Sequence, residues 1–380
     1  MKIILTYGLL VVLAAGCSKP ILLREIGLNK KGVVSYGNSL EQKFYYDINI
    51  STDLKFNWKT QTQGSFGTAS LIVYDKYIFA SDLAGRVYCF SDSSGKEIGE
   101  LKHKGEIAVS PVLAKDKLIY AVNNYKEKYS TLYYYFFKQG EFYKEIRIDG
   151  NCTNQIISSE NGIILLTQNG IIYSFNLIGD LEWKLITNKL TYSSPLLYNN
   201  SILFNSLSGD LIIVDVKTRK IKTQKKLSTS FESNLIVNGS TVFMGDTEGN
   251  IFCYDYIKDK INWIQSTGAK IVSEPVIDNK GFIYVGNLAG DLFCFEVENG
   301  KTIWEFKTNG VFRTAPIIFK NVLIQSDLDK KLLIINCSTG RIEKQIDFDR
   351  RVKTQPLYYK NKIYVGVDKG EIFSYQVEKL

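Results

Sequence analysis

The sequence has few of the residues that carry metal and acid–base chemistry. Its 380 residues include a single histidine, His103. No Cys-x-x-Cys pair and no cluster of histidines occurs, so residue spacing predicts no metal site. A Gly-x-Ser-x-Gly elbow is also missing, and any Ser/His/Asp or Cys/His centre would have to use His103. We interpret His103 as a solvated loop residue, and we expect no catalytic residue, no cofactor and no metal ion.

Long apolar runs are scarce as well. One run, from Ile3 to Ala15, lies near the N-terminus and is too short to span a bilayer with ordinary margins. Because Lys2 precedes this run and small residues follow it, we interpret residues 1–16 as a secretory signal peptide.

A cysteine follows this segment directly. The stretch Leu13-Ala14-Ala15-Gly16-Cys17 resembles the bacterial lipobox, which implies that Cys17 is lipidated and becomes the new N-terminus. Ser18 in the next position favours the outer membrane, by resemblance to enterobacterial lipoproteins. Residues 17–53 carry no repeat, and we expect them to form a lipidated tether. The alternative is an ordinary signal peptide with an incidental cysteine.

The rest of the chain repeats one unit, which is clearest from Ser273 to Trp304. This stretch contains four short apolar or alternating segments separated by Gly, Asn and Asp, which predicts four antiparallel strands joined by tight turns. A four-stranded sheet cannot bury both faces alone, so copies must stack. A period near 40 residues with four strands per copy is typical of a β-propeller.

The spacing supports eight copies. Gly170, Gly209, Gly249 and Gly290 each open a third strand, at steps of 39, 40 and 41 residues. The four tryptophans fall at the fourth-strand position of their copies. The eight predicted third strands are residues 86–90, 131–137, 171–175, 210–214, 250–254, 291–295, 331–335 and 371–375.

The last copy has no fourth strand of its own. The chain stops at Leu380 soon after a third strand, whereas residues 54–59 read as a fourth strand with no copy before it. We therefore predict that this N-terminal strand completes the eighth blade and removes the exposed sheet edges. The predicted fold is all-β, with an eight-bladed propeller of four-stranded antiparallel blades over residues 54–380.

Cysteines and acidic residues follow the same period. Cys89, Cys253 and Cys294 each lie four residues after the glycine of their copy, which predicts equivalent buried positions without disulfides; pairing of Cys152 with Cys337 stays open.

An Asp or Asn precedes most third strands, and we expect these side chains to fix turns instead of acting as acids or bases; they are Asp82, Asp246, Asn287, Asp327 and Asp368.

The formal net charge is +8, with a sequence pI near 8.9. Lysines dominate and interleave with acids, and a secreted protein rarely meets nucleic acid, so we expect no nucleic-acid partner. Contact with anionic lipid stays open.

The repeat itself resembles a known type. Copies such as SPLLYNNSILFNSLSGDLIIVDVKTRKI and EPVIDNKGFIYVGNLAGDLFCFEVENGKTIW are similar to the quinoprotein-type propeller repeat. A lipoprotein made of eight such units resembles the BamB-like outer-membrane assembly lipoproteins. This resemblance implies a non-catalytic scaffold on the periplasmic face of the outer membrane, a single copy of which binds the periplasmic domains of BamA within the Bam complex.

In that family the partner is bound by loops at one mouth of the ring, which join the fourth strand of one blade to the first strand of the next. The family's contact residues are not reproduced one by one in this chain. The corresponding loops carry basic residues with neighbouring apolar ones, a composition common in binding hot spots. We therefore predict a partner-binding surface formed by Lys189, Leu190, Tyr192, Lys270, Phe312, Arg313, Arg350, Arg351 and Lys353.

Three alternatives remain. The charges on these loops could be scattered and serve only solubility. The same repeat also builds pyrroloquinoline-quinone dehydrogenases, but those are much longer and typically carry an adjacent Cys-Cys pair, which does not occur here. A propeller that binds another small ligand, or an envelope scaffold for another protein, fits the repeat equally well.

Overall fold

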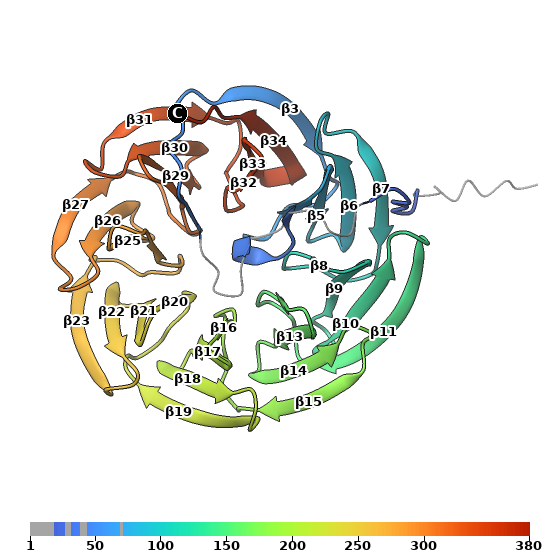
Figure 1. Ribbon diagram of the computed structural model, residues 1–380, viewed down its shortest axis with the longest axis horizontal. Coiled ribbons are helices and arrows are strands. Elements are labelled where there is room, and N and C mark those ends of the chain that lie inside the picture. Colours follow the sequence, from blue (N-terminus) through green and yellow to red (C-terminus); the bar gives the residue numbers. More distant parts are fainter. Residues whose placement is uncertain (1–18, 27–31, 39–43, 69–70) are drawn as a thin grey trace, which may run out of the picture.

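Eight antiparallel sheets are arranged as blades around a central axis (Figure 1). This computed structural model describes residues 19–26, 32–38, 44–68 and 71–380. Cys17 and the predicted signal peptide lie outside the described residues and stay predictions. Within each blade the first strand lies nearest the axis and the fourth lies at the perimeter.

The first four blades follow chain order. Blade 1 contains β4 (Leu71–Tyr74), β5 (Tyr77–Ser81), β6 (Arg86–Ser91) and β7 (Glu97–Lys102). Blade 2 contains β8 (Val112–Ala114), β9 (Lys117–Asn124), β10 (Tyr129–Phe136) and β11 (Glu141–Asp149). Blade 3 contains β12 (Ile157–Ser158), β13 (Gly162–Leu166), β14 (Ile171–Asn176) and β15 (Leu181–Ile186). Blade 4 contains β16 (Leu196–Tyr198), β17 (Ser201–Asn205), β18 (Asp210–Asp215) and β19 (Lys220–Lys226).

The other four blades complete the ring. Blade 5 contains β20 (Leu235–Asn238), β21 (Thr241–Gly245), β22 (Asn250–Asp255) and β23 (Lys260–Ser266). Blade 6 contains β24 (Val276–Ile277), β25 (Phe282–Gly286), β26 (Asp291–Glu296) and β27 (Thr302–Lys307). Blade 7 contains β28 (Ile317–Phe319), β29 (Val322–Asp327), β30 (Lys331–Asn336) and β31 (Ile342–Asp347). Blade 8 contains β32 (Leu357–Tyr359), β33 (Lys362–Val367), the 3₁₀ turn η2 (Asp368–Gly370) and β34 (Glu371–Gln376).

The predicted period is confirmed, because all eight predicted third strands are third strands of their blades. The closing strand is confirmed as well. It is β3 (Lys55–Gln61), which pairs antiparallel with β34 as the perimeter strand of blade 8, with Lys55 opposite Gln376 and Gln61 opposite Glu371. The first blade and the last blade are therefore tied together by a strand that precedes both in the sequence (Figure 1).

Tryptophans on perimeter strands connect neighbouring blades. Trp263 donates its indole N–H to the carbonyl of Val297 at 3.0 Å, and Trp304 donates to the carbonyl of Cys337 at 2.8 Å, each acceptor lying in the next blade. A Cβ on Gly300 would come within 2.6 Å of the Trp263 ring, so the turn that receives the indole requires glycine. The predicted fourth-strand position of the tryptophans thus has a packing function.

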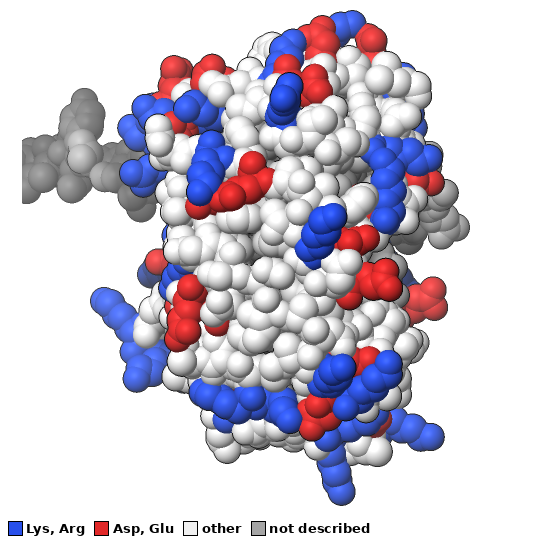
Figure 2. All heavy atoms as spheres, turned by 90° about the vertical axis from the view of Figure 1, so that its left-hand side faces the viewer, with Lys and Arg blue, Asp and Glu red and all other residues white. Residues whose placement is uncertain are grey.

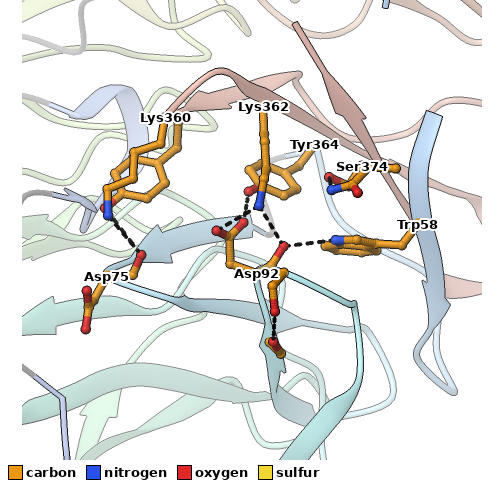
Figure 3. A network of polar contacts seen from close by, with 11 residues as sticks. Trp58, Asp75, Asp92, Lys360, Lys362, Tyr364 and Ser374 are labelled. Carbon is orange, nitrogen blue, oxygen red and sulfur yellow. Dashed lines mark hydrogen bonds and ion pairs between the residues drawn. The ribbon is translucent and has the colours of Figure 1, made fainter. Parts of the chain in front are cut away.

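An equivalent tryptophan contact joins blade 8 to blade 1, where it is part of a larger polar network (Figure 3). Trp58 on β3 donates to the carbonyl of Asp92 at 2.9 Å. Lys362 on β33 forms an ion pair with Asp92 at 3.0 Å, and the Tyr364 hydroxyl donates to the other carboxylate oxygen. One residue of blade 1 therefore binds two strands of blade 8.

The described residues before β3 pack on the propeller, an arrangement that the expected tether did not include. β1 (Gly32–Val33) pairs with β4 of blade 1, and β2 (Tyr45–Tyr46) pairs in parallel with β28 of blade 7. The 3₁₀ turn η1 (Tyr36–Asn38) lies between them, near the axis of the ring (Figure 1). Apolar side chains spaced along this N-terminal segment are buried and hold it on the propeller. They are Ile21, Leu23, Ile26, Val33, Phe44 and Ile50.

His103 is not the solvated residue that the sequence suggested. Its Nε2 lies 2.7 Å from the hydroxyl of Tyr120, and its ring lies 4.1 Å from that of Tyr133, centroid to centroid. Burial among these rings lowers the pKa of His103 to about 4.

The five cysteines among the described residues are all buried free thiols: Cys89, Cys152, Cys253, Cys294 and Cys337. No helix within the described ranges is long and apolar enough to cross a membrane.

Candidate partner surface and central pocket

Two kinds of connection meet at one mouth of the ring, which we call the loop mouth. The first kind joins a fourth strand to the first strand of the next blade, and the second joins the second and third strands of a blade. Hydrogen bonds tie the two together. Gly64 N–H donates to Asp82 Oδ2 at 2.8 Å, and Val311 N–H donates to Asp327 Oδ1 at 2.9 Å.

The periodic Asp and Asn residues fix these turns as predicted at Asp82, Asp246, Asn287 and Asp327, whereas the Asp368 carboxylate accepts a hydrogen bond from the Ser65 hydroxyl. Asp82 Oδ1 accepts the N–H groups of Ala84 and Arg86, both at 3.0 Å. Asp246 and Asn287 make the same pair of bonds in blades 5 and 6. The side chains of Asp82, Asp246 and Asn287 are therefore engaged in structure.

All of the predicted partner-binding residues belong to these connections, but Phe312 is not accessible. Its side chain is 0% exposed and lies in the core, where it fills the space above Gly286; a Cβ on that glycine would come within 2.7 Å of it. The sequence alone could not show whether Phe312 is an exposed aromatic side chain that binds a partner or a buried one that packs on a glycine of the neighbouring blade. We therefore remove Phe312 from the predicted surface.

Most of the basic residues of the loop mouth already have acidic partners. Lys189 pairs with Asp210 at 3.0 Å, and Lys270 pairs with Glu232 at 2.7 Å. Lys353 approaches Asp368 at 3.7 Å, and Arg350 approaches Glu371 at 3.8 Å. The positive charge that the sequence predicts here is thus partly neutralised.

Arg313 and Arg351 differ from these residues. Both are exposed, and neither forms an ion pair within the part of the chain that the structure describes. Leu190 and Tyr192 are also open to solvent, at 57% and 46%. Arg350 and Arg351 line a surface groove together with Gln61 and Asp349. The loop mouth therefore offers two free guanidinium groups and two exposed apolar side chains.

Elsewhere charges of both signs mix. On the side of the ring that carries β23 and β27, basic and acidic side chains alternate among uncharged atoms (Figure 2). No group of three or more His, Cys, Asp or Glu with the proximity of metal ligands occurs in residues 19–26, 32–38, 44–68 and 71–380.

A polar pocket of about 330 Å³ lies at the centre of the ring. Its walls come from connections of the loop mouth and from Tyr36 of the N-terminal segment; they include Thr68, Thr153, Gln155, Tyr192, Ser194, Glu232, Asn234, Glu274, Arg313, Thr314 and Gln355. Since Tyr192 and Arg313 are exposed, the pocket opens at the loop mouth.

A belt of hydrogen bonds passes around this pocket from blade to blade. The backbone N–H of Ser110 donates to Gln155 Oε1 at 3.3 Å, and that of Gln155 donates to Ser194 Oγ at 3.0 Å. The N–H of Ser194 donates to Asn234 Oδ1 at 2.7 Å, and Asn234 Nδ2 donates to Glu274 Oε2 at 2.9 Å. These side chains occupy the position just before the first strand in successive copies.

The belt ends at Glu274, because the equivalent residue of blade 7 is Ala315. There the Tyr36 hydroxyl donates to Glu274 Oε2 at 3.1 Å. Glu274 is 2% exposed, and its Oε1 has no partner among the described residues. Burial raises the pKa of Glu274 to about 8, and the bonds from Asn234 and Tyr36 only partly oppose that rise.

The sequence prediction missed this pocket. The residue before each first-strand proline is a visible signal, because it is Ser110, Ser194, Glu274, Ala315 or Gln355 in the five copies that have this proline. The sequence alone does not show that most of these residues line one pocket, because they converge only when the copies are arranged around one axis.

The model of one family, described as outer membrane protein assembly factor BamB, matches residues 55–265 and 259–379. The chain belongs to the BamB family. A comparison of the sequence with curated proteins finds no match.

Solved structures agree with the family fold. The crystal structure of BamB from Moraxella catarrhalis superposes with a TM-score of 0.70 at 14% identity, covering 85% of this chain and all of that one. The computationally designed Ika8 protein gives the same TM-score at 12% identity, covering 85% of this chain and 99% of its own. At such identities these likenesses show the propeller fold alone, and the family assignment rests on the BamB model.

Proposed function

We propose that this protein is a non-catalytic scaffold lipoprotein of the outer-membrane β-barrel assembly (Bam) complex. It is anchored by lipid on Cys17 to the periplasmic face of the outer membrane, and one copy binds the periplasmic domains of BamA through the loop mouth. The match of the BamB family model to residues 55–379, in two overlapping ranges, carries this proposal.

The loop mouth supports the proposal physically. Arg313 and Arg351 are exposed and free of ion pairs among the described residues. Leu190 and Tyr192 lie at the same mouth, in the connection from blade 3 to blade 4. Arginine combined with an exposed aromatic or aliphatic side chain is a common composition of binding hot spots. Complementary charge on a partner would increase the association rate.

The test is a charge reversal at the loop mouth. Arg313→Glu, Arg350→Glu and Arg351→Glu, combined in one chain, should reduce recovery of BamA in a crosslinking pull-down from detergent-solubilised envelopes at least tenfold. The matched control is Lys217→Glu, Lys301→Glu and Arg341→Glu. It makes the same change in net charge on exposed turns between third and fourth strands, away from the loop mouth.

The two failures are distinguishable. Equal recovery by the two triple variants would overturn the assignment of the surface. If the parent chain recovers no BamA, the proposed function itself is wrong.

The quinone-dependent alternative has weaker support. The acidic residues lining the central pocket are Glu232 and Glu274, and Glu232 is engaged by Lys270 at 2.7 Å. The remaining carboxyl group gives little basis for a calcium ion held together with a quinone.

A further inference from the structure

The central pocket contains one acidic and one basic side chain whose binding capacity is unused. Glu274 lies in its depth, 2% exposed, with Oε1 unpartnered within the described residues. Arg313 lies at its rim, exposed and without an ion pair in the same ranges. Arg313 belongs to the connection from blade 6 to blade 7, and Glu274 lies at the start of blade 6, so both poles come from one sector of the ring.

Uncharged polar atoms around these two groups are also unsatisfied. Thr314 Oγ1, Thr153 Oγ1 and both polar atoms of the Gln355 amide are buried and have no protein partner among the described residues. All of these side chains line the same pocket. A buried polar atom without a partner destabilises the fold, so native structures satisfy such atoms with water or a ligand.

The other charged group in the wall is already neutralised. Glu232 pairs with Lys270 at 2.7 Å, which leaves Glu274 and Arg313 as the charged lining residues open to a ligand. A ligand with only a cationic group would pair with Glu274 but leave Arg313 without a partner. A ligand with only an anionic group would pair with Arg313 but leave Glu274 without a partner. A ligand with both charges matches both poles.

We propose that the central pocket binds a small molecule that carries both an ammonium group and a carboxylate group. Glu274 releases its proton to solvent as the ammonium group donates to its Oε1, and the carboxylate pairs with Arg313 at the rim. The hydroxyl and amide groups of Thr153, Thr314 and Gln355 bind the polar atoms between the two ends. This activity is separate from the scaffold function, although the pocket and the partner surface share Arg313.

The experiment is calorimetric titration of the purified full chain with glycine, 4-aminobutanoate and 6-aminohexanoate, a series in which the distance between the two charges increases. Butylamine and butanoate carry one charge each and serve as probes of a single pole. We expect one member of the amino-acid series to bind in a 1:1 complex at least tenfold more tightly than either single-charge probe.

Three variants assign the poles. Glu274→Gln keeps the size and an acceptor oxygen but cannot ionise when the ammonium group binds, and it should weaken binding at least tenfold. Arg313→Gln should weaken binding at least fivefold, whereas Lys217→Gln on an exposed turn outside the pocket should leave it unchanged. Circular dichroism of each variant verifies that the propeller is folded, so a loss of binding is not a loss of fold.

Several results would overturn the proposal. The first is that none of the three amino acids binds, and the second is that folded Glu274→Gln binds them as tightly as the parent chain does. The third is that butylamine binds as tightly as the best amino acid and that Arg313→Gln does not change the affinity for butylamine. Glu274→Gln alters no exposed residue of the loop mouth, so it should still recover BamA. This separates a failure of the ligand proposal from a failure of the scaffold proposal.

Discussion

At the scale of the residue, Glu274 determines a pH dependence that can be measured. Its pKa is about 8 in the folded protein, against an ordinary value near 4.5. Between these pH values the folded chain retains a proton that the unfolded chain has released. The resulting stability is complete below about pH 4.5 and is lost as the pH rises through about 8, on the order of a few kcal/mol.

We therefore expect the melting temperature of the parent chain to fall relative to Glu274→Gln between pH 5.5 and pH 8.5. Differential scanning fluorimetry of the two proteins in matched buffers measures this difference. Lys270, Glu232 and Arg313 around the pocket are present in both chains. Burial and Glu274 raise the pKa of Tyr36 well above its ordinary value, so this tyrosine stays protonated over the range. Parallel melting profiles across this pH range would show that Glu274 titrates near its ordinary value.

Single residues are also where prediction from sequence was least complete. The loop position of Arg313 follows from the period, but the burial of Phe312 depends on Gly286, which lies in the neighbouring blade. Tyr36 and Glu274 are separated by 238 positions and meet only in the closed ring. The period predicts where a side chain occurs along its blade. It does not reveal what another blade places beside it.

At the scale of the element, the contact between blade 8 and blade 1 is the strongest candidate for a closing bond. Asp92 accepts hydrogen bonds from Trp58, Lys362 and Tyr364, and the side chains of the Asp92–Lys362 pair are 14% and 17% exposed. Asp92→Ala would leave Lys362 half-buried without its carboxylate. We expect a loss of about 2–4 kcal/mol of unfolding free energy, measured by denaturant titration.

The matched control for this prediction is Asp180→Ala. Asp180 also lies between a third and a fourth strand and pairs with Lys144 of the neighbouring blade at 2.7 Å, but its side chain is 57% exposed. An exposed ion pair of this kind contributes about 0–1 kcal/mol. If the two variants lose equal stability, the Asp92 network is not a special closing bond.

The elements themselves were predictable from the sequence, for a physical reason. Each blade must place glycine or Asx residues at its turns and apolar residues on the strands between them, so Gly209, Gly249 and Gly290 recur with the period of the sheet. The strand at residues 54–59 was identifiable because the last copy lacked one. The segment before it obeys no period, because it binds several different blades by contacts that each occur once.

At the scale of the whole molecule, residues 32–38 and 44–46 of this N-terminal segment lie along the inner edges of blades 1, 8 and 7, whereas residues 19–23 bind β7 and blade 2. β1 extends the sheet of blade 1 and β2 extends that of blade 7. Tyr46 stacks on Phe319 of blade 7 at 5.4 Å and contacts the ring of Tyr358 of blade 8 at 4.8 Å. The segment also carries Tyr36 into the central pocket, so its docking and the shape of the pocket are coupled.

Phe44→Asp tests whether this segment is a separate cooperative unit. Phe44 is 5% exposed, and an aspartate at this position would have to be solvated. We expect the segment to leave the ring while the blades stay folded, because β1 and β2 contribute two residues each to their sheets. Hydrogen exchange measured by mass spectrometry should then increase at β1, β2, β4 and β28, and remain unchanged in blades 3 to 5.

Ile257→Asp is the control, because Ile257 is 65% exposed and the same substitution there disturbs no packing. Faster exchange throughout the ring in Phe44→Asp would mean that the segment and the blades unfold together, so that the N-terminal residues belong to the propeller core. Exchange confined to the inner edges of blades 1, 8 and 7 would instead identify the segment as a removable wall of the central pocket. In that case Phe44→Asp should also weaken ligand binding at Glu274, because Tyr36 leaves the pocket together with the segment.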